Sequence, residues 1–523
     1  MRQRVFFRIV AALVLIMLAL AGPGLAQTPK KGGVIRLGIL GEPPALDAHW
    51  TTAVITELLT NHLYEGLYTL DEGYRPVPML AEGMPTVSGD GLTYTFKLRR
   101  GIKFHNGKEM TAEDVVASLK RWGQRSIRGK PLFASVAELR AVDRYTVEMR
   151  LKEKSAIVII SLAVNGNFGA IYPKEIAEKF PPENKITEYI GTGPFKLAEW
   201  KPDQYIRMVR FDDYKPRPEK PNGYGGAKIP YVDEIRWIPV PDVATRVAQI
   251  ETGELDLAED LNLDSYERLK SNPNVRAIVV KPYNWLVAVF NKKEGIGTNQ
   301  RVRQVWQAAI DIEPIMKTVA GGRSEFYRMD SSLCFAEITQ WHTQLPGLPW
   351  NEHNKEKAKR LLQEAGYKGE PLRFMTTQEY KWMYDFALLT KQQLEDVGFN
   401  IDLQVVDWST LVQRRNNPKA YDVFTTGMAS GAMLDPTHLD VVSCGWPGWN
   451  CDEEVQAIQS ELARETDYEK RFTLWKKQTR LFYEKVPVIR YGDLFGPRAI
   501  RGTVKGFNEK IERIRLYNVW LDK

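Results

Sequence analysis

The chain has 523 residues, of which 43% are hydrophobic and 26% charged, and its formal net charge is +7 at pH 7. This length predicts more than one domain, because single hydrophobic cores stop growing near ~250–300 residues. The charge is a mild excess on so long a chain, so it indicates neither nucleic-acid binding nor attachment to a membrane surface. The three cysteines form no C-x-x-C motif, which leaves a redox role without support.

The first 26 residues have the composition of a secretory signal peptide. Arg2, Arg4 and Arg8 form a basic start, residues 9–20 are an unbroken apolar run, and residues 24–26 supply small side chains for cleavage. The apolar run is shorter than the roughly 20 residues that a transmembrane helix needs. The sequence therefore predicts an exported protein whose signal peptide, residues 1–26, is cleaved after Ala26.

Strands and helices alternate along the rest of the chain. Apolar runs and period-two alternation predict strands at residues 34–40, 92–99, 232–239, 253–257, 400–406 and 421–427. Apolar residues at helical spacing predict helices within residues 47–67, 111–122, 243–250, 299–310 and 354–366, and another that ends at 397. Thr111, Asn299 and Asn354 are the expected N-caps. This alternation is typical of an α/β fold, and its spacing favours parallel sheets.

One segment carries a specific resemblance. Residues 87–122 read VSGDGLTYTFKLRRGIKFHNGKEMTAEDVVASLKRW. This segment is similar, almost residue for residue, to the signature of the peptide/nickel class (family 5) of extracytoplasmic solute-binding proteins, which feed ABC importers. Further stretches resemble the same family: Gly191–Phe195 with Tyr214, and residues 238–257, 290–311, 355–367 and 467–487. The resemblance thus covers nearly all of the chain after the signal peptide.

The resemblance implies a two-lobed, periplasmic-binding-protein-like α/β fold with a hinge and an extra subdomain in the first lobe. We expect lobe I over residues 27–285, with the subdomain inserted at about 60–185, lobe II over 286–494, and a return of 495–523 to lobe I. The two crossings between lobes are expected near 283–290 and 494–499. It further implies a periplasmic receptor, expected to be monomeric, that closes around a small solute and is recognised by an inner-membrane ABC permease.

No residue pattern indicates catalysis, a metal site or a cofactor. None of the six histidines lies at the i, i+4 spacing of a helical metal pair, and no H-E-x-x-H or G-x-S-x-G motif occurs. His105 is interpreted as a turn histidine that bonds locally. We therefore expect no enzymatic activity and no cofactor. An exported hydrolase that uses the same cleft remains the alternative from another class, and a sensor or accessory protein that feeds no transporter is a third.

Candidate ligand contacts come from the family register and from aromatic residues in loops. Thr52 and Val54 match a segment whose backbone faces ligand in peptide-binding relatives. Loop aromatic residues carry function more often than core ones. On these grounds, and with the resemblance of residues 443–449 to a family "GW.GW" loop, Trp285, Trp382, Trp446 and Trp449 are further candidates.

The register differs from peptide-binding relatives at one place. Their aspartate, which pairs with the α-ammonium of a peptide, falls here on Gly431 or Ala432 and is not retained. Met428, Ser430 and a shifted Asp435 are the candidates in this segment. The expected cargo is a peptide or peptide-like solute. The alternative is a solute without a free amine, such as an opine, a sugar derivative or a metal chelate.

Two of the three cysteines lie close together in the sequence. Cys444 and Cys451 flank a loop rich in Gly, Pro and Trp and could form a local disulfide. Cys334 would then be a small buried residue without a disulfide partner.

Overall fold

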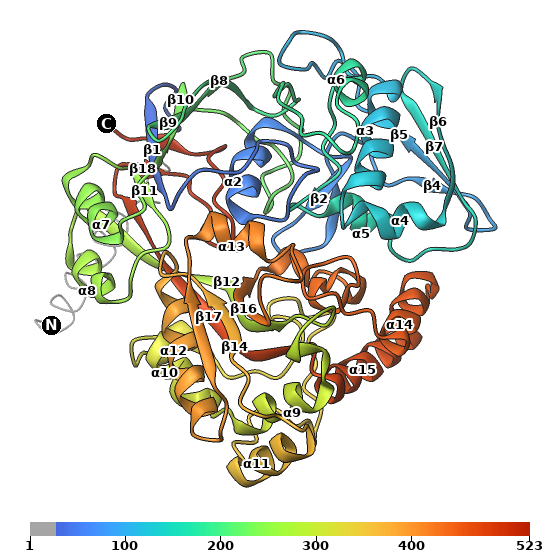
Figure 1. Ribbon diagram of the computed structural model, residues 1–523. Coiled ribbons are helices and arrows are strands. Elements are labelled where there is room, and N and C mark those ends of the chain that lie inside the picture. Colours follow the sequence, from blue (N-terminus) through green and yellow to red (C-terminus); the bar gives the residue numbers. More distant parts are fainter. Residues whose placement is uncertain (1–27) are drawn as a thin grey trace, which may run out of the picture.

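The computed structural model describes residues 28–523 of the chain (Figure 1). The predicted signal peptide and its cleavage site lie outside these residues. Within residues 28–523, no helix is both long and apolar enough to cross a membrane.

A mixed eleven-stranded sheet runs through both lobes, with the order β15-β14-β16-β12-β17-β11-β1-β10-β9-β8 and β13 paired to β17. Its lobe I strands are β1 (Val34–Ile39), β8 (Phe195–Lys201), β9 (Tyr205–Arg210), β10 (Glu234–Pro239) and β11 (Leu257–Ala258). Its lobe II strands are β13 (Tyr327–Arg328), β14 (Leu372–Thr376), β15 (Ile401–Val405) and β16 (Val423–Met428). The parallel pairing expected from the sequence holds for β1 with β10 and β11, and for β14 with β15 and β16. The remaining pairs of the sheet are antiparallel.

Two long strands connect the lobes. β12 (Val275–Phe290) and β17 (Val488–Arg501) pair antiparallel along most of their length, with register shifts at Val280/Asn284 and at Leu286/Val287. Both strands are longer than the crossings expected at 283–290 and 494–499. One end of each strand belongs to the lobe I part of the sheet, and the other end belongs to the lobe II part (Figure 1). The domain boundaries themselves stay predictions.

Lobe I carries α2 (Val54–Leu63), α7 (Val243–Thr252) and α8 (Asp264–Ser271). The helix expected within 47–67 is confirmed only from Val54. The residues before it are held in turns by the buried Asp47 carboxylate, which accepts a hydrogen bond from the His49 amide at 2.9 Å and pairs with Arg121 at 2.7 Å. A side chain that satisfies nearby backbone donors in this way competes with helix formation.

A four-stranded antiparallel sheet forms the core of the extra subdomain, in the order β4-β5-β7-β6. The elements of the subdomain are β4 (Thr86–Val87), β5 (Thr93–Lys97), α3 (Ala112–Arg125), α4 (Gly129–Ser135), β6 (Val136–Asp143), β7 (Thr146–Leu151), α5 (Val158–Ala163) and α6 (Lys174–Lys179). The predicted cap at Thr111 is confirmed and forms a capping box with Asp114. The short hairpin β2 (Tyr68–Leu70) and β3 (Pro76–Pro78) lies beside this subdomain.

The prediction that His105 bonds locally is wrong. Its Nε2 lies 3.0 Å from the Gly193 carbonyl oxygen, and its Nδ1 accepts a hydrogen bond from the Gly191 amide at 3.2 Å. Burial lowers the pKa of His105 to about 4. The family signature segment is thus fastened to the glycine-rich turn at 191–193.

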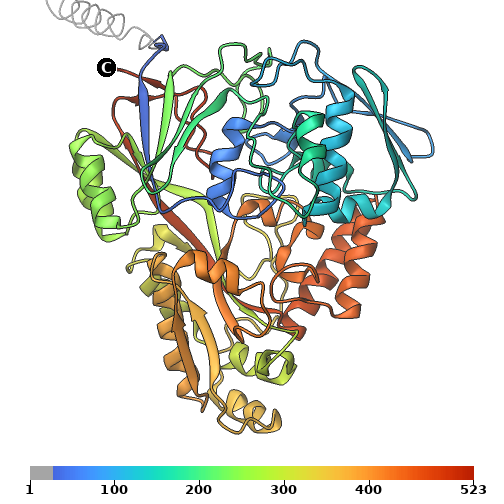
Figure 2. The same cartoon turned by 45° about the horizontal axis from the view of Figure 1, so that its top comes forward.

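Lobe II surrounds its part of the sheet with helices, as the view in Figure 2 shows. These are α9 (Gln300–Ala309), α10 (Ile312–Val319), α11 (Lys355–Glu364), α12 (Lys381–Glu395), α13 (Trp408–Arg414), α14 (Glu453–Arg464) and α15 (Tyr468–Lys485). The predicted caps at Asn299 and Asn354 are confirmed, since each side chain accepts a hydrogen bond from a backbone amide of its helix. After β17 the chain returns to lobe I through β18 (Val504–Lys505) and β19 (Trp520–Leu521).

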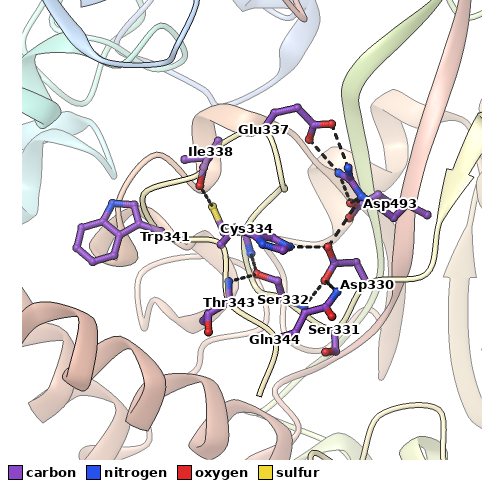
Figure 3. A network of polar contacts seen from close by, with 12 residues as sticks. Asp330, Ser331, Ser332, Cys334, Glu337, Ile338, Trp341, Thr343, Gln344 and Asp493 are labelled. Carbon is purple, nitrogen blue, oxygen red and sulfur yellow. Dashed lines mark hydrogen bonds and ion pairs between the residues drawn. The ribbon is translucent and has the colours of Figure 1, made fainter. Parts of the chain in front are cut away.

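A buried polar network joins the loop 329–344 to the crossing strand β17 (Figure 3). Asp330 accepts hydrogen bonds from the Ser332 amide and from Gln344, and lies 2.8 Å from His342 Nε2. Arg490 and Arg328 both pair with Asp493 at 2.7 Å. The Cys334 thiol is buried and unpaired, as predicted, and contacts the Met433 carbonyl oxygen at 3.5 Å. This network holds the loop that contacts Met433 through Cys334, and Met433 stands two residues after the cleft-lining Gly431.

Candidate ligand-binding cleft

A cavity lies between the two lobes and is lined by side chains from both. Its inner part, called here the inner chamber, has a volume of about 120 Å³. It opens into an outer chamber of about 690 Å³, and the two share Thr52, Tyr380, Trp408, Arg415 and Trp446. The outer volume falls within the range of roughly 300–1,000 Å³ that is usual for ligand sites. The α13 helix lies between α2 of lobe I and the sheet of lobe II (Figure 1). Trp408, Ser409, Val412 and Gln413 of this helix line the outer chamber.

The lobe I wall comes from the start of α2. Thr52 and Ala53 are in the extended segment before the helix, and Val54, Ile55 and Leu58 follow on its first turns. The Thr52 hydroxyl is half-buried at the cavity wall and makes no hydrogen bond within the described part of the chain, residues 28–523. This wall therefore offers one hydroxyl, free backbone groups at the helix start and a short apolar surface.

The lobe II wall is aromatic. Tyr380 and Trp382 begin α12, and Trp408 begins α13. The ring centroids of Tyr380 and Trp408 are 5.1 Å apart in an edge arrangement, and those of Tyr380 and Trp382 are 5.7 Å apart. Such rings give a large contact area with few rotatable bonds to immobilise.

Trp446 completes this wall from a loop closed by a disulfide. Cys444 and Cys451 are bonded, as expected from their spacing, with their Cα atoms 4.5 Å apart. Trp446 is 5% exposed and packs on Phe424 at a ring distance of 5.9 Å. Gly448 lies in the left-handed region, with φ +105°, and an added Cβ there would meet Val289 at 2.7 Å. The disulfide and this close approach fix the loop against the sheet.

A positively charged corner lies where the inner and outer chambers meet. Arg128, at the start of α4, donates to the His438 carbonyl oxygen at 3.2 Å and pairs with Asp440 at 3.3 Å. Arg415, just after α13, lies over the Trp446 ring at 5.7 Å. Burial raises the pKa of the Asp440 carboxyl, and the two guanidinium groups partly offset that rise. The corner thus holds two cations and one carboxylate.

The opposite side of the inner chamber is acidic but neutralised. Glu259 accepts a hydrogen bond from Arg498, and Asp260 accepts one from the Tyr283 hydroxyl. Burial, followed by the nearby Glu259, raises the pKa of Asp260 to about 6. Glu57 lies 3.8 Å from Arg513 and 3.6 Å from Arg515. Each carboxylate on this side already has a cationic or hydroxyl partner from the protein.

Five of the residues predicted to contact ligand line the inner chamber together: Thr52, Val54, Trp382, Met428 and Trp446. The structure differs from the prediction at Trp285, Ser430, Asp435 and Trp449, none of which lines either chamber. Trp285 is fully buried and stacks on Phe482 at 6.3 Å. Trp449 stacks instead on Tyr421, also at 6.3 Å.

The two polar residues in this set are engaged elsewhere. Asp435 accepts two hydrogen bonds from Arg471, at 2.8 and 2.9 Å, and caps a short 3-10 helix. The hydroxyl and the amide of Ser430 both donate to Glu512 in the returning C-terminal segment. Asp435 is therefore unavailable as a shifted ammonium anchor, and Ser430 joins the two lobes.

Sequence reasoning missed Tyr380, Arg415 and Asp440 at this site. Tyr380 is next to the predicted Trp382, and its place at a helix start is a signal that could have included it. Arg415 has no such signal, because an arginine after a helix is ordinary on a surface and only the fold buries it. Trp408, which lines both chambers, stands two residues after the predicted strand 400–406. The end of a strand is a common place for ligand contacts in α/β proteins.

Comparisons with known proteins identify what the chain is similar to. Residues 75–446 match the family described as bacterial extracellular solute-binding proteins, family 5 Middle. The oligopeptide-binding protein AppA of Bacillus subtilis is 28% identical over 95% of this chain and 93% of its own length. The glutathione-binding protein GsiB of Salmonella typhimurium is 28% identical over 78% of this chain and 75% of its own.

Solved structures show the same fold. The structure of AppA in complex with a nonapeptide aligns with a TM-score of 0.83 at 24% identity and covers 95% of this chain and 100% of that one. The structure of AgaA from A. tumefaciens R10 in complex with agropinic acid aligns with a TM-score of 0.80 at 22% identity. That alignment covers 94% of this chain and 99% of AgaA.

Proposed function

We propose a function from one premise: this chain belongs to the bacterial extracellular solute-binding proteins of family 5. It is the solute-binding component of an ABC importer. It captures a peptide or peptide-like solute between its two lobes and delivers it to an inner-membrane permease. Binding proteins of this kind exist in an open–closed equilibrium, and a ligand that contacts both lobes stabilises the closed form.

The observation that carries this proposal is the two-sided lining of the cavity. Thr52 and Val54 come from lobe I, and Trp382, Met428 and Trp446 come from lobe II. A solute in this cavity would touch both lobes at once, which is the differential contact that closure requires. The crossing strands β12 and β17 are the connection about which the lobes would move.

The proposal includes no chemical step. The carboxylates that line the inner chamber have cationic or hydroxyl partners, and within residues 28–523 no group of three or more His, Cys, Asp or Glu side chains is placed to hold a metal ion. We also propose that the signal peptide is removed after Ala26 and that the mature protein acts in the periplasm. N-terminal sequencing of the exported protein, which should begin at Gln27, tests this.

Native mass spectrometry of the protein isolated from the periplasm tests the receptor function. We expect a single small molecule to remain bound, to leave intact on denaturation and to be unchanged after prolonged incubation with fresh protein. Conversion of that molecule would support a hydrolase instead. A protein that carries no small molecule and rebinds none from periplasmic extract would contradict the proposal.

A further inference from the structure

We propose that Arg415 binds a carboxylate of the solute, so that the cargo is an acidic molecule whose recognition needs no free ammonium group. This inference rests on the proposed function and names the class of solute for the same cleft.

The first observation is the state of the Arg415 side chain. It is 8% exposed, its Nε is buried without a hydrogen-bond partner, and within residues 28–523 its guanidinium nitrogens make no hydrogen bond or ion pair. Yet it lines both the inner and the outer chamber. A guanidinium presents five N–H donors in a planar fork, and a donor left without a partner away from water, as the Nε–H is here, is costly. The unused donors therefore face the space that the solute would occupy.

The second observation is the local charge balance. Asp440 is the carboxylate that acts electrostatically on Arg415, and Asp440 already pairs with Arg128. Burial lowers the pKa of Arg415 to about 10, so it stays protonated at neutral pH. Two cations against one carboxylate leave one positive charge uncompensated in a mostly buried corner. A buried charge without a partner is strongly unfavourable, and a solute anion would supply that partner.

The outer chamber repeats this bias. Its charged lining consists of four basic and two acidic residues: Arg125, Lys130, Lys185, Arg415, Glu42 and Glu379. Glu42 is occupied, because it accepts hydrogen bonds from Trp200 Nε1 at 3.2 Å and from the Asp203 amide at 2.9 Å. A cleft with an excess of one charge concentrates ligands of the opposite charge. The approach to Arg415 therefore favours an anion.

The third observation concerns the ammonium group that peptides carry. The four carboxylates that line the inner chamber belong to Glu57, Glu259, Asp260 and Asp440, and all four have protein partners. The family aspartate position falls on Gly431 or Ala432, and Asp435 is paired with Arg471. An ammonium group in this chamber would have to displace one of these partners. Arg415, in contrast, can bind a carboxylate without breaking any existing pair.

The surroundings of Arg415 indicate where the rest of the solute lies. Trp446 is beneath its guanidinium, and Trp408 and Tyr380 line the same two chambers. A carboxylate held by Arg415 would place the neighbouring apolar or planar part of the solute against these rings. Charge-assisted, bidentate contact at one end and aromatic contact along the body would together orient the solute.

Thermal-shift measurements with matched pairs of solutes test this directly. Each pair differs only in a carboxylate against a carboxamide: Ala-Leu and Ala-Leu amide, N-acetyl-Ala-Leu and its amide, and phenylpropionate and phenylpropionamide. We expect the carboxylate members to raise the melting temperature, and N-acetylation to change the affinity less than about 3-fold. In R415Q the carboxylate should lose its advantage of about 10–100-fold over the amide, as expected for a charge-assisted pair.

R414Q is the matched control, because Arg414 is the exposed neighbour with the same change of charge. It should keep the preference for carboxylates. R415K, which keeps the charge but loses the planar fork, should retain only part of it.

Three results would overturn the inference: amides that stabilise as well as carboxylates, a carboxylate preference that survives in R415Q, or stabilisation only by solutes with a free ammonium group. A panel in which no carboxylate stabilises the protein at millimolar concentration would also overturn it. These failures are separable from failure of the receptor function. A solute that binds equally well as acid and amide and still compacts the protein leaves the receptor function intact. If a carboxylate binds through Arg415 and the protein does not become more compact, the anion site is supported and lobe closure is refuted.

Discussion

Arg128 Nη2 lies 3.3 Å from Asp440 Oδ2, although 312 residues separate them in the chain. Arg128 belongs to the subdomain of lobe I, and Asp440 belongs to the lobe II segment after β16. Both side chains are buried. The pair therefore joins the lobes at the edge of the cleft. Because Asp440 is paired with Arg128, the positive charge of Arg415 is left without a carboxylate partner of its own.

This arrangement predicts an order of stability for three charge-removing variants. D440N leaves two buried guanidinium groups without a carboxylate and should lower the free energy of unfolding by about 3–5 kcal/mol. R128Q should cost less, because Asp440 can turn to Arg415. R415Q removes the uncompensated charge, so it should leave the stability of the unliganded protein unchanged or raise it. Urea unfolding of the three variants measures this order, and an R415Q variant as unstable as D440N would contradict it.

A second contact between the lobes predicts an effect on affinity. Ser430 donates from its hydroxyl to Glu512, and S430A removes that bond while it leaves the amide contact. A hydrogen bond to a charged group contributes about 1.5–3 kcal/mol, so the closed form should lose population and the affinity should fall by about 10-fold or more. Calorimetric titration with the carboxylate that stabilises the wild type best measures this loss. S460A, on the exposed face of α14, is the control, and equal affinities of both variants would refute the role of Ser430.

The buried His62 predicts how stability depends on pH. Its Nδ1 lies 2.8 Å from the Leu58 carbonyl oxygen and its Nε2 accepts from the Leu516 amide at 3.0 Å, so the folded protein holds a neutral ring. Burial lowers the pKa of His62 from 6.5 to about 3. Between pH 6.5 and about pH 3, His62 binds a proton in the unfolded chain but not in the folded protein. The stability from this group is therefore complete above pH 6.5 and falls by about 1.4 kcal/mol per pH unit below it.

Denaturant unfolding of wild type and H62Q between pH 7 and pH 4.5 measures this slope. H62Q should lose about one proton's worth of pH dependence relative to the wild type. Identical slopes in wild type and H62Q would show that His62 does not titrate as its burial requires.

The disulfide predicts two effects of its removal, one on stability and one on solute binding. Cys444 and Cys451 are seven residues apart, so their bond closes a short loop and should contribute about 2–3 kcal/mol by the chain-entropy relation. Its reduction should also free Trp446, which is buried against Phe424. We expect the C444S/C451S variant to remain folded at 25 °C and to bind its solute at least several-fold more weakly. Circular dichroism checks that the variant is folded, and fluorescence titration measures its affinity for the solute. An unchanged affinity would show that the disulfide-closed loop does not contribute to binding.

Much of the fold follows from local signals in the sequence. Thr111 with Asp114, Asn299 and Asn354 mark helix starts that the structure confirms, because capping involves only neighbouring residues. The crossings expected at 283–290 and 494–499 lie within two strands, β12 and β17, that are longer than these ranges. Their outer parts are held by pairing with strands distant in the chain, and local patterns do not reveal such pairing.

The site was predictable in part for the same reason. Thr52 and Trp446 lie in segments whose register the family resemblance fixes, and both line the cavity. The pairing of Asp435 could not be foreseen, because its partner, Arg471, stands 36 residues away and is brought to it only by the fold. Arg415 was missed because its significance is the lack of a partner, which is a property of the folded protein and not of the sequence around it.

Small-angle X-ray scattering with and without a bound solute tests the central claim most directly. With a saturating carboxylate solute, or with the molecule that co-purifies, we expect the radius of gyration of the wild type to decrease as the lobes close about β12 and β17. R414Q should compact equally. A solute that raises the melting temperature but leaves the scattering curve unchanged would contradict capture by lobe closure.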